Sequence, residues 1–225
     1  MNALIRFNIY YYFKTNRYLV PFVLHFIFLY FIYGSGNIPL QEGYILTTIS
    51  IFLCSFFIGF VIIDSEPVVI QKLFVLHYRI RLKKFYLTKI LTVGLIASLL
   101  IVLNILCPIF LFGNFQADVM ITALGIQIST AISGGVLAMF LSKKMISDRI
   151  LAIIFAFVIV VLSLSATGIR NMLPDYLHFI LYLLPPVHLS IKAITEPNLS
   201  DVFFPCIYAI VITTIWINII SKRSF

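Results

Sequence analysis

Charged side chains are scarce in this sequence. They make up 11% of its 225 residues, and only eight of them are acidic. Soluble domains average about 25% charged residues, so this deficit excludes an ordinary soluble fold. The sequence is instead 62% hydrophobic, and we expect a single all-α integral membrane domain over residues 1–225.

Cysteine is also rare, and the three cysteines occur in or near apolar runs. Cys54, Cys107 and Cys206 include no pair in a connection on the outer side. This arrangement gives no indication of a disulfide framework and favours a role as small apolar packing residues.

Signatures of enzymes are absent as well. The sequence contains no Gly-x-x-x-x-Gly-Lys phosphate loop, so we do not expect the chain to hydrolyse ATP alone. It contains no His-Glu-x-x-His or Gly-x-Ser-x-Gly motif. Residues 133–135, Ser-Gly-Gly, could suggest an intramembrane serine site, but no histidine partner is apparent and packing is the preferred interpretation. We therefore expect no catalytic residue, metal or cofactor on this chain.

Long apolar runs are abundant. A membrane span needs roughly 20 apolar residues, and six stretches qualify. None of their cores contains Asp, Glu, Lys or Arg, which argues against proton or sodium coupling through such groups. His25, in the first stretch, is interpreted as a core histidine rather than a proton relay. The predicted spans are residues 18–33, 44–63, 90–112, 120–141, 150–169 and 202–220.

The basic residues predict how these spans are oriented. Fourteen of the sixteen Lys and Arg residues fall in the two termini and in the second and fourth connections. Only Arg170 and Lys192 fall on the other side. Since basic residues stay in the cytoplasm, both termini should be cytoplasmic. This bias accounts for the net charge of +8, and the dispersed basic residues give no reason to expect nucleic-acid binding.

The first 17 residues predict a helix along the cytoplasmic membrane surface. Arg6, Lys14 and Arg17 fall on one broad face at helical spacing, with Leu4, Phe7, Tyr11 and Tyr12 largely opposite. An ordinary basic anchor is the alternative. We expect the first span to be retained, because no small-residue cleavage site follows it.

The connection at residues 64–89 has more structure than a topology signal needs. It holds six basic residues, and Pro67 suits the first turn of a helix. Val68, Val69, Leu73 and Leu76 recur at helical spacing. The pattern predicts a short helix, a turn and a second helix that enters the membrane. A solvated basic loop is the alternative, but an apolar helical stripe favours a docking element.

Two further segments carry patterns. Small residues recur every four positions in the fourth span, which favours close helix packing within the subunit, with a dimer face as the alternative. The segment at residues 170–201 contains short apolar pieces separated by two prolines, which predicts a pair of short helices in the outer leaflet that pack against the spans. The predicted packing residues are Gly125, Ser129, Ser133 and Gly134, and the outer-leaflet motif comprises Pro185, Pro186, His188 and Lys192.

Together these motifs resemble the membrane subunit of an ABC exporter of the ABC-2 type. The resemblance rests on the six-span plan with its entry helix, on Glu66 and the 88–91 step Thr-Lys-Ile-Leu in the basic connection, and on the proline motif before the last span. The connection departs from the family in having Thr88 where glycine is common. It also has residues 77–79, His-Tyr-Arg, where a proline-centred turn is typical.

The resemblance implies partners and contact residues. Two membrane subunits, identical or related, would pair with two cytoplasmic ATPases, which would bind ATP and Mg²⁺. The region at residues 67–81 would be the coupling helix. The implied coupling residues are Glu66, Pro67, Val69, Lys72, Leu73, Leu76, His77 and Arg79, and the implied secondary contacts are Arg6, Lys143, Lys144 and Asp148.

The cargo is not specified by any motif. An apolar, charge-free path predicts export of amphipathic or hydrophobic compounds, with peptides as the first choice, for export or for self-protection. Because 22 Phe and 12 Tyr are present, polysaccharide export stays open, as does lipid or drug export. A channel or scaffold without an ATPase is the alternative from a different class.

Overall fold

Helices account for all the regular structure in the described part of the chain. The structure, a computed structural model, describes residues 1–34, 36, 38–64, 81–112, 116–142, 146, 148–195 and 199–223. In chain order, the helices are α1 (Asn2–Lys14), α2 (Leu19–Gly34), α3 (Leu40–Asp64), α5 (Leu82–Phe112), α6 (Ala117–Phe140), α7 (Arg149–Leu164), α8 (Ala166–Met172), the 3₁₀ helix η1 (Asp175–Leu183), α9 (Val187–Thr195) and α10 (Leu199–Arg223).

Four of these helices are long and apolar enough to cross a membrane. They are α3, α5, α6 and the Phe203–Lys222 part of α10. Three bent helix pairs would raise the number to seven if each pair formed one span. The prediction of an all-helical protein with several helices able to cross a membrane is therefore confirmed.

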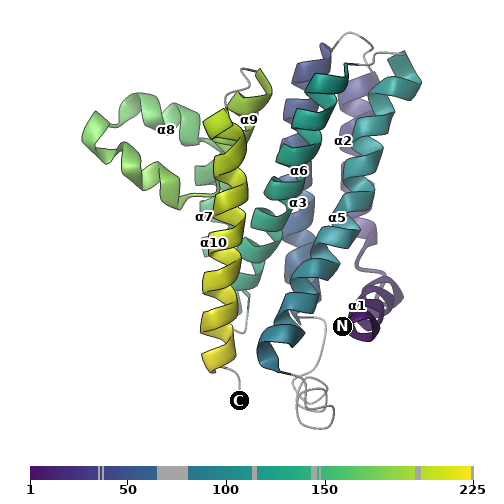
Figure 1. Cartoon of the computed structure of the whole chain (residues 1–225), viewed down its shortest axis with the longest axis vertical. Helices are drawn as coiled ribbons and strands as arrows, with labels where there is room; N and C mark the ends of the chain where they lie inside the picture. Colours follow the sequence, from purple (N-terminus) through teal and green to yellow (C-terminus); the bar gives the residue numbers. More distant parts are fainter. Residues whose placement is uncertain are drawn as a thin grey trace.

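The centre of the bundle is the pair α3 and α6. These two helices cross closely, with α5 and α10 against α6 and α2 against α3 (Figure 1). Glycine allows the close approach, because a Cβ at Gly59 of α3 would collide with the backbone of Gly135 on α6. On α10, Trp216 is fully buried and packs edge-on against Tyr86, with ring centroids 5.4 Å apart.

Helix α1 lies across the end of the bundle. It meets α2 at an angle of 76°, and Asn16 in the turn between them has φ 54°, a left-handed conformation that asparagine tolerates. The buried face of α1 is Leu4, Asn8 and Tyr12. Asn8 was not in the predicted apolar face; its amide donates to the Thr92 hydroxyl of α5 at 3.5 Å.

The fifth predicted span is not one straight helix. Helix α7 ends at Leu164, and α8 follows at an angle of 69°. At the break, the Ser165 hydroxyl donates back to the carbonyl of Val161 at 2.8 Å, an arrangement that often bends helices. The stretch predicted as the fifth span, residues 150–169, is thus a bent helix pair that is apolar enough to cross a membrane only when its two helices are taken together.

Two short helices occupy the segment before α10. Helices η1 and α9 meet at 103°, with Pro185 and Pro186 between them. Helix α9 packs against α3, α6 and α10. In contrast, α8 and η1 project from the bundle (Figure 1), and only Leu181 of η1 is buried. The expectation that both short helices pack against the spans is met by α9 and not by most of η1.

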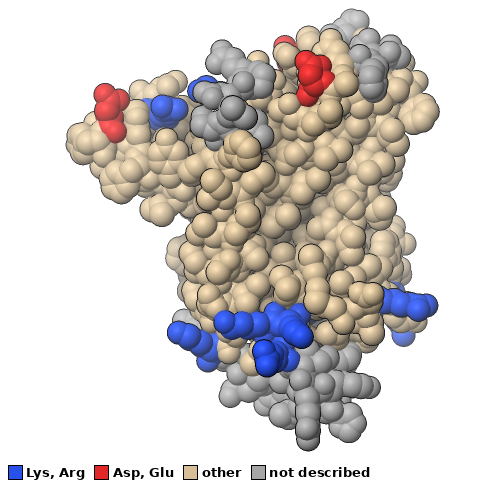
Figure 2. Space-filling view, viewed as in Figure 1, with Lys and Arg blue, Asp and Glu red and all other residues tan. Residues whose placement is uncertain are grey.

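Charge is segregated along the bundle. Figure 2 shows most of the Lys and Arg side chains on this face gathered at the end where both termini lie, whereas the acidic side chains and a smaller share of the basic ones lie at the opposite end. The basic end is also where α3 ends at Asp64 and α5 begins at Leu82.

Candidate functional site

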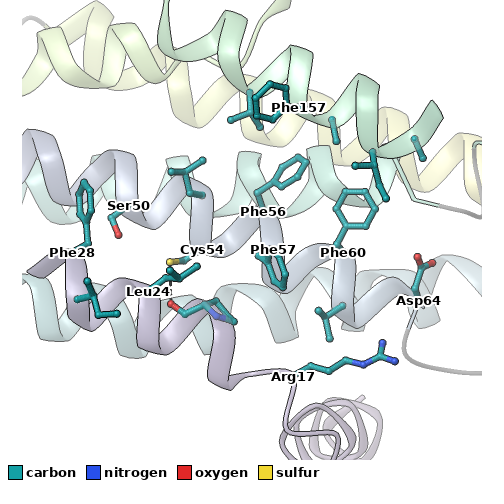
Figure 3. Close-up of a pocket in the computed structure, with 18 of the residues that line it drawn as sticks. Arg17, Leu24, Phe28, Ser50, Cys54, Phe56, Phe57, Phe60, Asp64 and Phe157 are labelled. Atoms are coloured by element: carbon teal, nitrogen blue, oxygen red, sulfur yellow. Dashed lines mark hydrogen bonds between the residues drawn. The ribbon is translucent and has the colours of Figure 1, made fainter. Parts of the chain in front are cut away.

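A groove of about 870 Å³ runs between α2, α3 and α7. Helix α3 forms the middle of its wall, with α2 on one side and α7 on the other (Figure 3). Helix α7 contacts α9 along the chain's outer flank, and Ala156 of α7 packs in a cluster with Phe52 of α3 and Leu137 of α6. The three helices thus leave an elongated apolar hollow on the flank of the bundle.

Phenylalanine is the most frequent residue type in the lining of the groove. On α3, Phe56 and Phe60 lie one turn apart and extend toward α7, whereas Phe57 extends toward α2 (Figure 3). Such a wall offers apolar contact to hydrophobic surface. The phenylalanines that line the groove are Phe28, Phe31, Phe56, Phe57, Phe60 and Phe157.

The polar groups within the groove wall are already paired. The Ser50 hydroxyl lies 2.8 Å from Nδ1 of His25, and the Cys54 thiol donates to the carbonyl of Pro21 at 3.4 Å. Charge occurs at one end of the groove, where Arg17 and Asp64 are both exposed (Figure 3). The groove therefore matches a molecule with a long apolar part and a polar end.

Behind the groove, polar side chains join helices inside the bundle. Fully buried Asn104 of α5 donates to Gln127 of α6 at 3.4 Å, and Gln127 donates to Thr47 of α3 at 3.2 Å. His25 joins α2 to α3 through Ser50. Such bonds specify which helices pair. Sequence reasoning missed the chain of Asn104, Gln127 and Thr47, because isolated amides and hydroxyls within apolar runs carry no motif.

Within the described residues, no group of three His, Cys, Asp or Glu side chains could hold a metal ion. The Nε2–H group of His178, in η1, donates to the carbonyls of Arg170 and Leu173, at 3.1 and 3.2 Å. Nδ1 of the same ring lies 3.8 Å from the carboxylate of Asp175.

Most of the predicted ATPase contacts lie outside the described residues. Those of the predicted coupling segment are Glu66, Pro67, Val69, Lys72, Leu73, Leu76, His77 and Arg79, and those of the second contact are Lys143 and Lys144. Arg6 is exposed on α1. Asp148 has a structural role, because its carboxylate accepts from the backbone N–H groups of Ile150 and Leu151 at 2.8 and 3.4 Å and so caps α7.

The predicted packing residues divide into two groups. Ser129 and Ser133 are buried, and a Cβ at Gly134 would lie 2.7 Å from the Ser55 hydroxyl and 2.8 Å from the Phe52 carbonyl of α3. A Cβ at Gly125, however, would meet no atom within 4 Å, so this glycine is not part of a close helix contact. The tightest part of the crossing is formed by Gly135, for which packing was the preferred interpretation, and by Gly59, which no pattern in the sequence singled out.

The predicted outer-leaflet motif lies at the end of the bundle opposite the basic end. Pro185, Pro186 and His188 are buried, whereas Lys192 is exposed. Helix α9 is tied to α6 by the hydroxyls of Ser190 and Thr130, which lie 3.2 Å apart. Arg170, His188 and Lys192 share a small pocket of about 200 Å³.

Comparisons with known proteins add no identity. No protein-family description, curated protein or solved structure matches this chain.

Proposed function

We propose that this chain is the membrane-spanning subunit of an ATP-driven exporter of the ABC-2 type in a bacterial plasma membrane. Its six spans would be α2, α3, α5, α6, α7 and α10, with both termini in the cytoplasm. The observation that carries the proposal is the gathering of Lys and Arg at one end of the bundle (Figure 2). This is the end from which residues 65–80 connect α3 to α5.

A cytoplasmic ATPase would supply the energy. Two copies would dock on two membrane subunits, identical or related. In each subunit, residues 67–81 would be the coupling helix, and α1 and the α6–α7 connection would add contacts. Exposed Arg6 on α1 supports the contact through α1. Closure of the ATPase pair would favour one arrangement of the membrane helices over another, through a difference in docking energy between two states.

The groove between α2, α3 and α7 is the proposed wall of the transport path. Its phenylalanine lining, with Arg17 and Asp64 at one end, supports an amphipathic or hydrophobic cargo. Peptides are the first choice, for export or for self-protection. A polysaccharide, a lipid or a drug is the alternative, and a channel or scaffold without an ATPase is the alternative from a different class.

The deciding experiment is affinity capture of the full chain from its native membrane. We expect an ATPase that contains a phosphate loop to be captured with the intact chain, and we expect it to be lost when residues 68–76 are deleted. Deletion of the same number of residues from the projecting η1 segment is the matched control and should leave capture intact. Absence of an ATPase, or capture that survives the 68–76 deletion, would favour a channel or scaffold.

Two substitutions test the coupling residues more narrowly. Glu66→Lys and Leu73→Asn should each leave membrane insertion normal while ATP hydrolysis no longer drives transport.

The class of cargo can be identified with a strain that lacks this chain. The sensitivity of that strain to a panel of peptides should differ from that of the wild type. An unchanged peptide profile would favour polymer, lipid or drug export.

A further inference from the structure

A lysine is fully buried near the basic end of the bundle. Lys89 lies two turns into α5 and has 0% of its side chain exposed. The sequence placed it in a cytoplasmic connection that ended at this residue, whereas α5 already begins at Leu82. Its neighbours on the same helix, Lys83 and Lys84, are exposed. Lys89 is therefore an interior residue and not one of the charges in the solvated connection.

The ammonium group of Lys89 joins two helices. Its Nζ donates to the backbone carbonyl of Ile62 on α3, at 3.0 Å. It also lies 5.3 Å from the ring centroid of Phe85, one turn earlier on α5, within the range of a cation–π contact. Phe85 is itself buried, with 1% exposed. The contacts hold the charge between the end of α3 and the start of α5.

The position of Ile62 explains why a cation suits this place. Helix α3 ends at Asp64, so the carbonyl of Ile62, which accepts from Lys89, belongs to the last turn of the helix. The C-terminal end of a helix also carries partial negative charge, which a cation stabilises. Lys89 thus supplies to the end of α3 a hydrogen bond and a positive charge from a neighbouring helix.

Packing alone does not account for a lysine here. Burial of an ammonium group carries a large desolvation cost that its partners must offset. A methionine would fill similar space without that cost. The ammonium group therefore has a role that an apolar side chain could not fill. Its hydrogen bond to Ile62 connects α5 to α3 at the two ends of residues 65–80.

We propose that Lys89 is a positioning residue that clamps the end of α3 to α5, so that the two ends of residues 65–80 move as one unit. The clamp follows from geometry within this chain. Its use in coupling rests on the proposed function, in which an ATPase docks on residues 67–81. Without the clamp, a force on that segment would separate the helix ends instead of tilting both helices together.

The test measures the clamp directly in the full chain in lipid nanodiscs. Spin labels at positions 64 and 81, in a version without the native cysteines, report the distance between the two helix ends. We expect Lys89→Met to lengthen and broaden this distance distribution, and Lys89→Arg, which keeps the charge and the donors, to restore it towards the wild type. Lys84→Met, an exposed lysine on the same helix, should change nothing. A distribution that is unchanged in Lys89→Met, or equally changed in Lys84→Met, would overturn the clamp.

A second readout separates the clamp from the proposed function. With the captured ATPase present, Lys89→Met should lower transport per ATP hydrolysed, while ATPase capture stays at the wild-type level. If the labels separate but no ATPase is ever captured, the clamp stands and the exporter proposal fails. If the labels separate, the ATPase is captured and transport per ATP is unchanged, the role of Lys89 in coupling is overturned.

Discussion

The crossing of α3 and α6 and the flank formed by α7 are built in opposite ways. At the crossing, Gly59, Gly134 and Gly135 bring two backbones into contact, and almost every residue in the second half of α6 is buried. Along α7, only small residues such as Ala152 and Ala156 are buried, and most of the large apolar side chains are exposed. The first region fixes the bundle, and the second borders a groove that a cargo or a neighbouring molecule can fill.

From this contrast comes the central claim, a prediction that the α3–α6 centre stays rigid while α7 changes its position. The proposed transport path would need both properties, because helices that move must move against something fixed.

The largest effect is expected at Gly59. Gly59→Val would force a branched side chain into the backbone of Gly135, and we expect a destabilisation of more than about 5 kcal/mol with loss of folded protein. Thermal unfolding in detergent, followed by circular dichroism and size-exclusion chromatography, measures it. Gly125→Val on α6, where an added Cβ meets no atom within 4 Å, is the matched control. Equal loss of stability in both variants would remove the crossing from its central role.

The second prediction compares two phenylalanines on α3. Phe52 is fully buried, so Phe52→Ala should cost about 3–5 kcal/mol. Phe57 is 44% exposed and lines the groove, so Phe57→Ala should change stability by only about 0.5 kcal/mol but should reduce transport. Unfolding midpoints and export of a labelled peptide separate the two effects. Normal export in Phe57→Ala would argue against the groove as the path.

The sequence alone predicted the long helices well, because an apolar run of about 20 residues has few alternatives in a membrane protein. The sequence did not predict the features that depend on a single side-chain contact. The break at Ser165 depends on one hydroxyl that bonds back to Val161, and the interior place of Lys89 depends on a carbonyl 27 positions earlier in the chain. No local pattern reveals either contact.

The small residues that recur along α6 show the same limit of prediction from sequence. Regular spacing on α6 suggested close packing, but spacing does not say which face meets α3. Gly134 lies at the contact and Gly125 does not. The partner glycine, Gly59, lies on another helix, so only the paired structure identifies it.

A smaller effect is expected from the buried polar chain. Gln127→Leu removes the bonds to Asn104 and Thr47, and their groups would be left without those partners. We expect a loss of about 1–2 kcal/mol, measured by thermal unfolding. A double variant, Asn104→Leu with Gln127→Leu, should lose less than the sum of the two single changes. Additive losses would mean that the two amides do not act together.

The smallest effect is expected at the start of α7. Asp148→Ala removes the cap on the N–H groups of Ile150 and Leu151 and should cost about 1 kcal/mol, confined to α7. Asp148→Asn keeps an acceptor oxygen and should retain most of the cap. Limited proteolysis near residue 148 measures the local loosening. If ATPase capture also fails in Asp148→Asn, then the charge has a second role in docking.

Hydrogen–deuterium exchange in lipid nanodiscs tests the central claim most directly. The backbone amides of α6 should exchange slowly, with protection that approaches that of global unfolding, and those of α7 should exchange much faster through local opening. Filling the groove with a bound peptide should slow exchange in α7 and leave α6 unchanged. Equal protection of α6 and α7 in the empty protein would contradict the account, because the fixed centre and the movable flank would then be one rigid body.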